Sequence, residues 1–535
     1  MRPPGTPRRR RRRLAALALA CLSVLATLGG CTGARGEPVT LRVLAASELA
    51  DMQPLLGDLR RETGITLTME YQGTIEATTS LATGQYRHDL AWLSSSRPFQ
   101  LLWKAGGRRA DVPPATSTMS SPVAVGLKPE VAKRLRGATP DGQLSWADLA
   151  DAAAAGTLKY AMADPRRANS GLAALIGVAT AAAGTGGALR PEDVSCDRLR
   201  GFFAGHALTE DSSGRLVDAY ARGEDGLDGL ITYESELLAL GRAGTLRTPL
   251  EIVYPKDGIV LSDYPLMLLD PAKRAAYDRL TAWLRSEPVQ RKIMERTLRR
   301  PVDPGLARVP GLRAPLGNAL YFPDRQAVVD RLLADYADAR AGRPVRVIFL
   351  LDFSTSMRGD RIANLRATMD GLGGADGSRS GKFTRFHQGE TLTVVRFGGR
   401  VLDERSVTYT GAPDLERLRG TLADDTFDAG TAVWSALDHG YRIAADAVAR
   451  DPGQRVSIVL MTDGENNAGI SLDTFLARYA ALPEAARAVR TYTVRYGESD
   501  PRELDRAARA TGGHMADATG QSLPNAFKEI RGCRE

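Results

Sequence analysis

Histidine, cysteine and aromatic residues are all scarce in this chain of 535 residues. Phenylalanine, tryptophan and tyrosine together make up 6% of it, and only four cysteines are present. The five histidines stand far apart, at positions 88, 206, 387, 439 and 514. No two have the spacing of a zinc site, and the G-x-S-x-G, Walker and H-E-x-x-H motifs are absent. These absences exclude the common catalytic signatures, so we expect a binding protein and not an enzyme.

Acidic residues are missing from the first 36 positions, where arginine is dense. Seven arginines, Arg2 and Arg8 to Arg13, lie in the first thirteen residues, and the first acidic residue is Glu37. Without these seven, the formal charge of the chain falls from +8 to +1. The basic balance therefore belongs to the leading segment, and it gives no support for a nucleic-acid partner.

An apolar stretch, LAALALACLSVLATLGGC, follows the arginines and ends at Cys31. A basic start, an apolar centre and small residues at the end are typical of an export signal. The last four residues, from Leu28 to Cys31, resemble a bacterial lipobox, in which the cysteine is lipidated. We therefore predict a lipoprotein signal peptide over residues 1–31 and a lipid anchor that holds the protein on the extracytoplasmic face of the cell membrane. An ordinary cleaved signal and an uncleaved membrane anchor are the alternatives.

Two further cysteines, Cys196 and Cys533, lie in the remainder of the chain. An even pair outside the cytoplasm favours a disulfide between them. The alternative is two unpaired thiols in different domains.

Strand-like and helix-like segments alternate from Pro38 onward. Residues 40–47 (TLRVLAAS) predict a buried strand, residues 48–64 an amphipathic helix closed by Gly64, and residues 65–73 the next strand. A second alternating block begins near residue 120. Such alternation predicts parallel α/β layers, and two blocks suit a bilobed body with a cleft over residues 38–315.

This first part resembles an extracellular solute-binding protein of the two-lobed periplasmic-binding type (type II). The resemblance rests on VLAASELADMQPLL, YQGTIEATTSLATG, MSSPVAVGLK, MADPRRANSGLAAL and LSDYPLMLLD. Ligands of open α/β sheets bind at the carboxyl ends of strands, and free N–H groups at helix starts suit a small polar or anionic solute. The candidate ligand contacts are polar residues near such positions: Ser47, Thr74, Ser95, Ser170 and Tyr233. The alternative for the serines and the threonine is that they simply cap helices.

Residues 316–343 are expected to form a connecting helix, and a second α/β domain follows over residues 344–535. Its predicted strands are 345–354, 390–399, 455–464 and 489–498, with a long helix before the third. This order predicts a Rossmann-like, doubly wound sheet of about the size of one domain.

Oxygen-bearing side chains end or open three of these segments, with no histidine or cysteine beside them. Asp352, Ser354 and Ser356 form a D-x-S-x-S pattern after the first strand; Thr431 precedes the long helix, and Asp463 follows the third strand. Such donors suit Mg²⁺, or else Mn²⁺ or Ca²⁺, and do not suit zinc. Two carboxylates and three hydroxyls leave the ion incompletely coordinated, so an acidic residue of a protein partner could complete the shell. A lone D-x-S-x-S is more often a turn, so the prediction depends on all three segments meeting.

The same residues resemble the metal-ion-dependent adhesion site (MIDAS) of the von Willebrand factor A (VWA) domain. The resemblance covers residues 344 to about 531 and includes the segment LDRAARATGGHMADAT. Thr355 stands where the family often has glycine, which removes no ligand. The tripeptide Arg358-Gly359-Asp360 falls in the loop that enters a helix, and we interpret it as local structure and not as a recognition motif.

Two functions are compatible with this organisation. The first is a membrane-anchored lipoprotein whose VWA domain binds a protein partner through a metal ion, in adhesion or complex assembly. The second is a receptor that captures a solute for an ABC-type transporter and carries an accessory VWA domain. A tight small-molecule response of residues 38–315 would favour the second.

Overall fold

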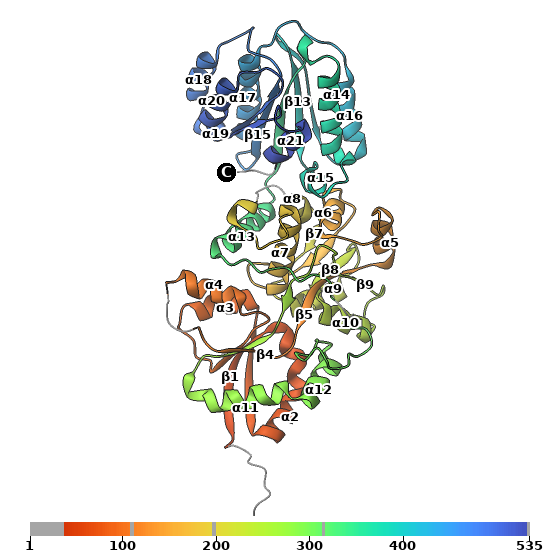
Figure 1. Ribbon diagram of the computed structural model, residues 1–535, viewed down its shortest axis with the longest axis vertical. Coiled ribbons are helices and arrows are strands. Elements are labelled where there is room, and N and C mark those ends of the chain that lie inside the picture. Colours follow the sequence, from red (N-terminus) through yellow and green to blue (C-terminus); the bar gives the residue numbers. More distant parts are fainter. Residues whose placement is uncertain (1–36, 108–111, 195–198, 313–315, 532–535) are drawn as a thin grey trace, which may run out of the picture.

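The computed structural model describes residues 37–107, 112–194, 199–312 and 316–531. Three bodies follow one another along the longest axis of the molecule (Figure 1). We call them lobe one (residues 37–117 and 265–297), lobe two (residues 121–262 and 326–340) and the C-terminal domain (residues 345–531). Within the described residues, no helix has both the length and the apolar character needed to cross a membrane.

Lobe one is a five-stranded sheet covered by helices, in the order β2-β1-β3-β11-β4. Its strands are β1 (Val39–Ala46), β2 (Ile65–Gln72), β3 (Leu90–Trp92), β4 (Ala115–Ser117) and β11 (Pro265–Leu268). Its helices are η1 (Ser47–Met52), α2 (Gln53–Thr63), α3 (Thr74–Ala82), α4 (Arg97–Ala105), η3 (Pro271–Lys273), α11 (Arg274–Arg285) and α12 (Glu287–Thr297). Strands β1, β2 and β3 are parallel, whereas β11 returns from lobe two and runs antiparallel to β3 and β4. The strand-helix-strand order predicted for residues 40–73 is confirmed.

Lobe two is built around a second sheet, in the order β10-β5-β8-β6-β7, with β9 also paired to β5. Its strands are β5 (Ser121–Leu127), β6 (Tyr160–Met162), β7 (His206–Leu208), β8 (Gly229–Tyr233), β9 (Glu251–Val253) and β10 (Leu261–Ser262). Its helices are α5 (Pro129–Gly137), α6 (Trp146–Ala154), α7 (Asn169–Ala183), η2 (Pro191–Asp193), α8 (Arg200–Ala204), α9 (Ser213–Arg222), α10 (Glu234–Ala243) and α13 (Gln326–Arg340). Helix α13 lies in the expected connecting segment, and its Val328, Leu332 and Tyr336 are buried in the core of lobe two. The connection is therefore part of lobe two and not a free linker.

The chain crosses between the lobes where β4 leads to β5 and where β10 leads to β11. Ser120 and Arg300 pair through their backbones beside the first crossing, with N–O distances of 2.8 Å in both directions. The guanidinium of Arg300 also donates to both carboxylate oxygens of Glu234 in α10, at 2.7 and 2.8 Å. Both side chains are buried, so this ion pair fixes the segment after α12 against lobe two.

The C-terminal domain is one six-stranded sheet with helices on both faces, in the order β14-β13-β12-β15-β16-β17. Its strands are β12 (Val345–Asp352), β13 (Thr391–Phe397), β14 (Val401–Thr408), β15 (Arg455–Thr462), β16 (Arg490–Arg495) and β17 (Met515–Asp517). Its helices are η4 (Thr355–Met357), α14 (Asp360–Asp370), η5 (Gly371–Ala375), α15 (Arg379–Thr384), α16 (Ala412–Ala423), α17 (Val433–Arg450), α18 (Leu472–Ala480), α19 (Glu484–Arg487), α20 (Pro501–Ala510) and α21 (Leu523–Arg531). All the strands are parallel except β14, which pairs antiparallel with β13 at one edge. The doubly wound fold is thus confirmed, while β14 and α16 were not predicted.

The central strand β12 shows why both faces need a cover. Phe349 and Leu351 pack on one face with α14 and α21, and Ile348 and Leu350 pack on the other with α17. A strand buried on both faces is apolar without alternation, which is what VIFLL in residues 347–351 shows.

Helix α15 joins the C-terminal domain to lobe two (Figure 1). The ring of Phe383 is 3% exposed and belongs to the hydrophobic core of lobe two. Two ion pairs flank it: Lys382 with Asp148, and Arg385 with Asp151 at 2.6 Å. The C-terminal domain is therefore packed on lobe two through a buried aromatic contact.

Candidate functional site

The carboxyl ends of β12 and β15 bring Asp352 and Asp463 to the same edge of the C-terminal sheet. Between them lie the two serines of the D-x-S-x-S pattern. The hydroxyl oxygens of Ser354 and Ser356 are 2.9 Å apart, and the Ser356 hydroxyl donates to Oδ1 of Asp463 at 2.9 Å. The structure thus assembles side chains from two loops that are more than a hundred residues apart in sequence.

Thr431 approaches the same place from the loop before α17. A Cβ placed on Gly464, which follows Asp463, would lie 3.6 Å from Oγ1 of Thr431 and 4.0 Å from Oγ of Ser356. Asn467 fixes this loop by accepting a hydrogen bond from the Thr431 backbone N–H at 2.8 Å. All three predicted segments therefore meet at one edge of the sheet.

The two carboxylates of this cluster are both buried, at 0% exposure for Asp352 and 1% for Asp463. Asp352 accepts hydrogen bonds from the Ser354 N–H at 2.7 Å and from the Thr462 hydroxyl at 2.6 Å. Burial nonetheless raises the pKa of Asp352 to about 6. Asp463 is instead paired with a cation, because Arg361 Nη1 lies 2.5 Å from its Oδ2.

The donor chemistry of the cluster fits a hard divalent cation. Two carboxylates and three hydroxyls are oxygen donors. Among the described residues, no cationic side chain lies at hydrogen-bond distance from the buried carboxylate of Asp352. Mg²⁺ favours such oxygens together with water. Residues Asp352, Ser354, Ser356, Thr431 and Asp463 could hold the ion, and its binding stays a prediction.

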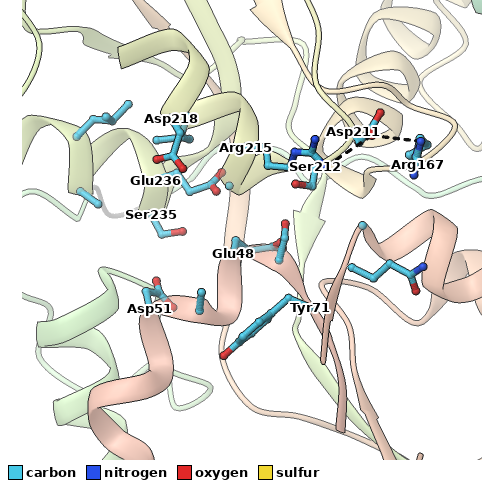
Figure 2. A pocket seen from close by; sticks show the side chains of 18 of the residues that line it. Glu48, Asp51, Tyr71, Arg167, Asp211, Ser212, Arg215, Asp218, Ser235 and Glu236 are labelled. Carbon is cyan, nitrogen blue, oxygen red and sulfur yellow. Dashed lines mark hydrogen bonds and ion pairs between the residues drawn. The ribbon is translucent and has the colours of Figure 1, made fainter. Parts of the chain in front are cut away.

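A second candidate site is a cleft of about 640 Å³ between lobes one and two. Figure 2 shows Glu48, Asp51 and Tyr71 on the lobe-one side, opposite Asp218, Ser235 and Glu236 of lobe two. The volume lies within the range of small-molecule pockets, about 300–1,000 Å³.

The two lobes touch beside this cleft at Gly73. The backbone N–H groups of Ile75 and Glu76 donate to the Arg167 carbonyl at 2.9 and 3.2 Å. A Cβ on Gly73 would lie only 2.5 Å from that carbonyl oxygen, so this approach needs glycine. The first turn of α3 is thus in direct contact with lobe two.

Comparisons with known families agree with this architecture. Residues 41–296 match the family described as bacterial extracellular solute-binding protein, and residues 347–529 match the von Willebrand factor type A domain. The chain joins a solute-binding domain to a VWA domain. The predicted family resemblances are confirmed for both parts. Among curated proteins, none matches the chain.

Several solved structures are similar to the solute-binding domain. The periplasmic binding protein AfuA from Actinobacillus pleuropneumoniae covers 56% of this chain and 98% of its own, with 15% identity and a TM-score of 0.44. HitA from Pseudomonas aeruginosa, in its iron-bound form, covers 56% and 99%, with 16% identity and a TM-score of 0.43. A periplasmic thiamin binding protein covers 57% and 98%, with 13% identity and a TM-score of 0.44.

The predicted solute contacts are distributed unevenly around the cleft. Ser47 lines it, but the other four predicted residues are not among those that do. The hydroxyl of Thr74 bonds to that of Ser94 at 2.8 Å, and the hydroxyl of Ser170 bonds to that of Ser213 at 2.7 Å. Ser95 accepts from the Arg97 N–H at 3.2 Å, and the Tyr233 hydroxyl accepts from Asn169 Nδ2 at 3.1 Å. These four are buried and bonded within the protein, and their contact with a solute stays a prediction.

The acidic residues of the cleft were not predicted from the sequence. Glu48 and Asp51 lie in η1, directly after β1, and Glu236 lies in the first turn of α10, directly after β8. An acidic residue near a helix start is ordinarily explained by the helix dipole, so the local pattern does not single these out. The available signal was that each follows a strand whose carboxyl end faces the cleft.

Two further predictions lie outside the described residues. They are the lipid anchor at Cys31 and the disulfide between Cys196 and Cys533.

Proposed function

We propose that the protein is a membrane-anchored, extracytoplasmic lipoprotein that binds other proteins through a metal-dependent site in its VWA domain. Its role is adhesion or complex assembly, and it is not an enzyme. The solute-binding domain lies between the anchor and the VWA domain and carries the second binding site.

The observation that supports the metal-dependent site is the meeting of five oxygen-bearing side chains at one sheet edge. Of these, Ser356 is exposed, whereas Asp352 and Asp463 are buried beneath it. Buried carboxylates beneath an exposed hydroxyl would hold a cation from below and leave its outer side open. The bound cation would offer that open position to an aspartate or glutamate of the partner.

The chain's own residues divide the work between holding the ion and shaping the loop. Asp352 and Asp463 supply the negative charge, and the three hydroxyls supply neutral oxygens. Thr462 and the Ser354 N–H keep the Asp352 carboxylate in place at 2.6 and 2.7 Å. The surrounding loops then supply partner selectivity, since the ion itself recognises only a carboxylate.

The proposal is tested by cation binding to the full-length chain, purified in detergent. Mg²⁺ or Mn²⁺ should raise the free energy of unfolding of the VWA domain by about 1.4 kcal/mol when the free ion is tenfold above its Kd. Asp352→Asn should abolish this stabilisation, because it removes the buried negative charge while it keeps the side-chain shape. Thermal unfolding with and without EDTA measures both.

Asp360→Asn is the matched control, because Asp360 is an exposed carboxylate in the same loop region and lies outside the cluster. It should respond to Mg²⁺ like the unaltered chain. Equal stabilisation of all three proteins, or of none, would contradict the metal site. Binding of a protein partner in the presence of EDTA, or by Asp352→Ala, would contradict ion-dependent docking.

A second function is supported by the cleft, which is large enough for a small solute. In this alternative the chain captures a polar or anionic solute for an ABC-type transporter, and the VWA domain is accessory. A solute that stabilises the solute-binding domain at micromolar concentration, with no effect of divalent ions on the VWA domain, would favour it over the first.

A further inference from the structure

The charge on the walls of the cleft has a definite sign. Six carboxylates and two guanidinium groups line it. Both arginines are already paired with acids: Arg167 lies 2.8 Å from Glu76 and 3.2 Å from Asp211, and Arg215 lies 3.8 Å from Asp211 (Figure 2). The remaining carboxylates, on Glu48, Asp51, Asp218 and Glu236, give the inner part of the cleft an excess of negative charge.

A third arginine, Arg299, stands behind the lobe-one wall and makes an ion pair with only one of these acids. Arg299 is fully buried, and its Nη1 lies 2.6 and 2.8 Å from the two carboxylate oxygens of Asp51. Its Nη2 donates to the backbone carbonyl of Glu48 at 3.1 Å and not to the carboxylate. Arg299 thus makes an ion pair with Asp51 alone, although its positive charge partly offsets the rise in the pKa of Glu48 and Glu236.

Two polar atoms at the inner wall have no hydrogen-bond partner among the residues that the structure describes. Oε1 of Glu48 is buried and unpaired, and so is Oγ of Ser235. The two residues are 8% and 1% exposed, and both line the cleft from opposite lobes. Unpaired buried polar atoms cost free energy, so their positions are suited to an occupant with hydrogen-bond donors.

Glu236 faces Glu48 across the cleft, and the Thr232 hydroxyl bonds to its carboxylate. Burial and the nearby charge of Glu48 raise the pKa of Glu236 to about 8. Burial also raises the pKa of Glu48. The electrostatic repulsion between two facing carboxylates falls when a positive group enters between them.

We propose that the cleft recognises a small organic cation, whose ammonium or guanidinium group lies between Glu48 and Glu236 and donates to Glu48 Oε1 and Ser235 Oγ. This rests on the proposed solute-binding role of the domain. The ring of Tyr71, which lines the same cavity beside Glu48, gives the cation an aromatic surface. Positive solutes are therefore favoured over the anionic ones expected from helix starts alone.

An organic cation fits this wall better than a metal ion does. In the part of the chain that the structure describes, no group of three or more histidine, cysteine, aspartate or glutamate side chains is placed to hold a metal. A cation with several N–H donors can satisfy two carboxylates and a hydroxyl that are spread over opposite walls. The cleft also has an apolar surface from Val217, Ala239 and Leu240, which suits a carbon skeleton.

The test is ligand binding by the full-length chain at pH 8 with EDTA present, so that divalent ions do not contribute. Putrescine and agmatine represent primary ammonium and guanidinium donors, and choline represents a quaternary ammonium group, which has no N–H to donate. Inorganic phosphate, sulfate and a sugar phosphate represent anions, and a neutral hexose represents uncharged solutes. Putrescine or agmatine should bind in calorimetry and raise the unfolding midpoint of the solute-binding domain.

Glu48→Gln and Glu236→Gln should each weaken that binding by at least about tenfold, because each removes one of the two facing charges. Asp225→Asn is the matched control, since Asp225 is 73% exposed in lobe two and pairs with Arg247 outside the cleft. Its affinity for the same cation should be unchanged. Equal weakening in all three variants would overturn the assignment of the site.

The other outcomes separate this inference from the solute-binding role. Binding of an anion or the hexose, with no response to any cation, would overturn the cation and leave solute binding intact. No response to any of the seven compounds would overturn both. Binding that is lost in Arg167→Gln but kept in Glu48→Gln and Glu236→Gln would place an anion at the arginines. That result would also overturn the proposal of a cationic ligand.

A ligand-free measurement keeps the inference testable if a variant binds nothing. Because Glu48 and Glu236 repel each other without an occupant, neutralising either should stabilise the empty chain. At pH 8 the unfolding midpoint of Glu48→Gln or Glu236→Gln should rise by about 2 °C. A lower midpoint in both would mean that the carboxylates are already satisfied within the protein, which overturns the inference.

Discussion

Asp463 accepts hydrogen bonds from two very different side chains. Ser356 donates to its Oδ1, while Arg361 in the first turn of α14 contacts its Oδ2. The arginine side chain is 36% exposed, and the carboxylate it neutralises is fully buried. Without this guanidinium, Asp463 would be a second buried carboxylate without a cation beside it, so Arg361 is a built-in competitor for any bound ion.

Removing that competitor should tighten cation binding. Arg361→Gln leaves Asp463 free to neutralise Mg²⁺, and the affinity for Mg²⁺ should rise by about threefold to tenfold. The metal-free chain should lose stability at the same time, because a buried carboxylate loses its partner. Titration calorimetry measures the first effect and urea unfolding in EDTA measures the second.

Arg358→Gln is the matched control for that change. Arg358 carries the same charge three residues earlier, but its guanidinium lies 5.1 Å from the ring of Phe427. An equal gain in Mg²⁺ affinity in both variants would show that only the general positive field of the loop matters. A fall in affinity in Arg361→Gln would show that the arginine positions Asp463 for the ion.

At the scale of elements, α15 is unusual because it is short and serves two domains. It belongs to the C-terminal chain segment, yet its Phe383 completes the core formed by α6, α7 and α8 of lobe two. Two ion pairs restrict how α15 can rotate against α6. Lys382 pairs with Asp148 and Arg385 pairs with Asp151, and both aspartates lie in α6. The VWA domain is therefore tied to lobe two by packing as well as by the chain.

This contact should couple the unfolding of the two domains. Phe383→Ala removes a buried ring and should destabilise the joined unit by about 3 kcal/mol. Scanning calorimetry should then show the VWA domain and lobe two melting in separate transitions, where the unaltered chain melts them together. Phe475→Ala removes an equally buried ring inside the VWA core and should lower stability without separating the transitions. Separate transitions in the unaltered chain would contradict the coupling.

At the scale of the whole molecule, the described chain begins at the end of lobe one that is opposite to the VWA domain (Figure 1). Lobe two stands between them, and the cleft opens between lobes one and two. If residues 1–31 lead to an anchor at Cys31, the solute-binding domain lies next to the membrane and the VWA domain is farthest from it. This order presents the proposed metal site outward to a partner.

Anchoring through Cys31 has a direct test. Cys31→Ser should move the protein from the membrane fraction to the soluble extracytoplasmic fraction, because no acyl chain can be attached. Metabolic labelling with a fatty acid should mark the unaltered chain and not the variant, because the acyl chains are attached at Cys31. More than one acyl chain is needed for stable anchoring. Retention of Cys31→Ser in the membrane would favour an uncleaved apolar segment instead.

The sequence by itself determined both folds and which oxygen-bearing side chains meet at the edge of the C-terminal sheet. Apolar strands such as β12 have a local signature, and the carboxyl ends of parallel strands lie at one edge of a sheet. Asp352 and Asp463 could therefore be placed together from local patterns alone. The edge strand β14 was missed for the converse reason, since it is mostly exposed or half-buried and carries no apolar run.

Only the tertiary structure decided the sign of the charge on the cleft walls and the packing of the VWA domain on lobe two. Glu48 and Glu236 look like ordinary helix-start acids until the lobes place them face to face across the cleft. From the sequence, Phe383 looks like a core residue of its own domain, but in the structure it packs into the core of lobe two. Local periodicity reports which side of an element is buried, whereas the partner across the interface sets the charge balance and the packing. That partner is fixed by contacts between segments far apart in the chain.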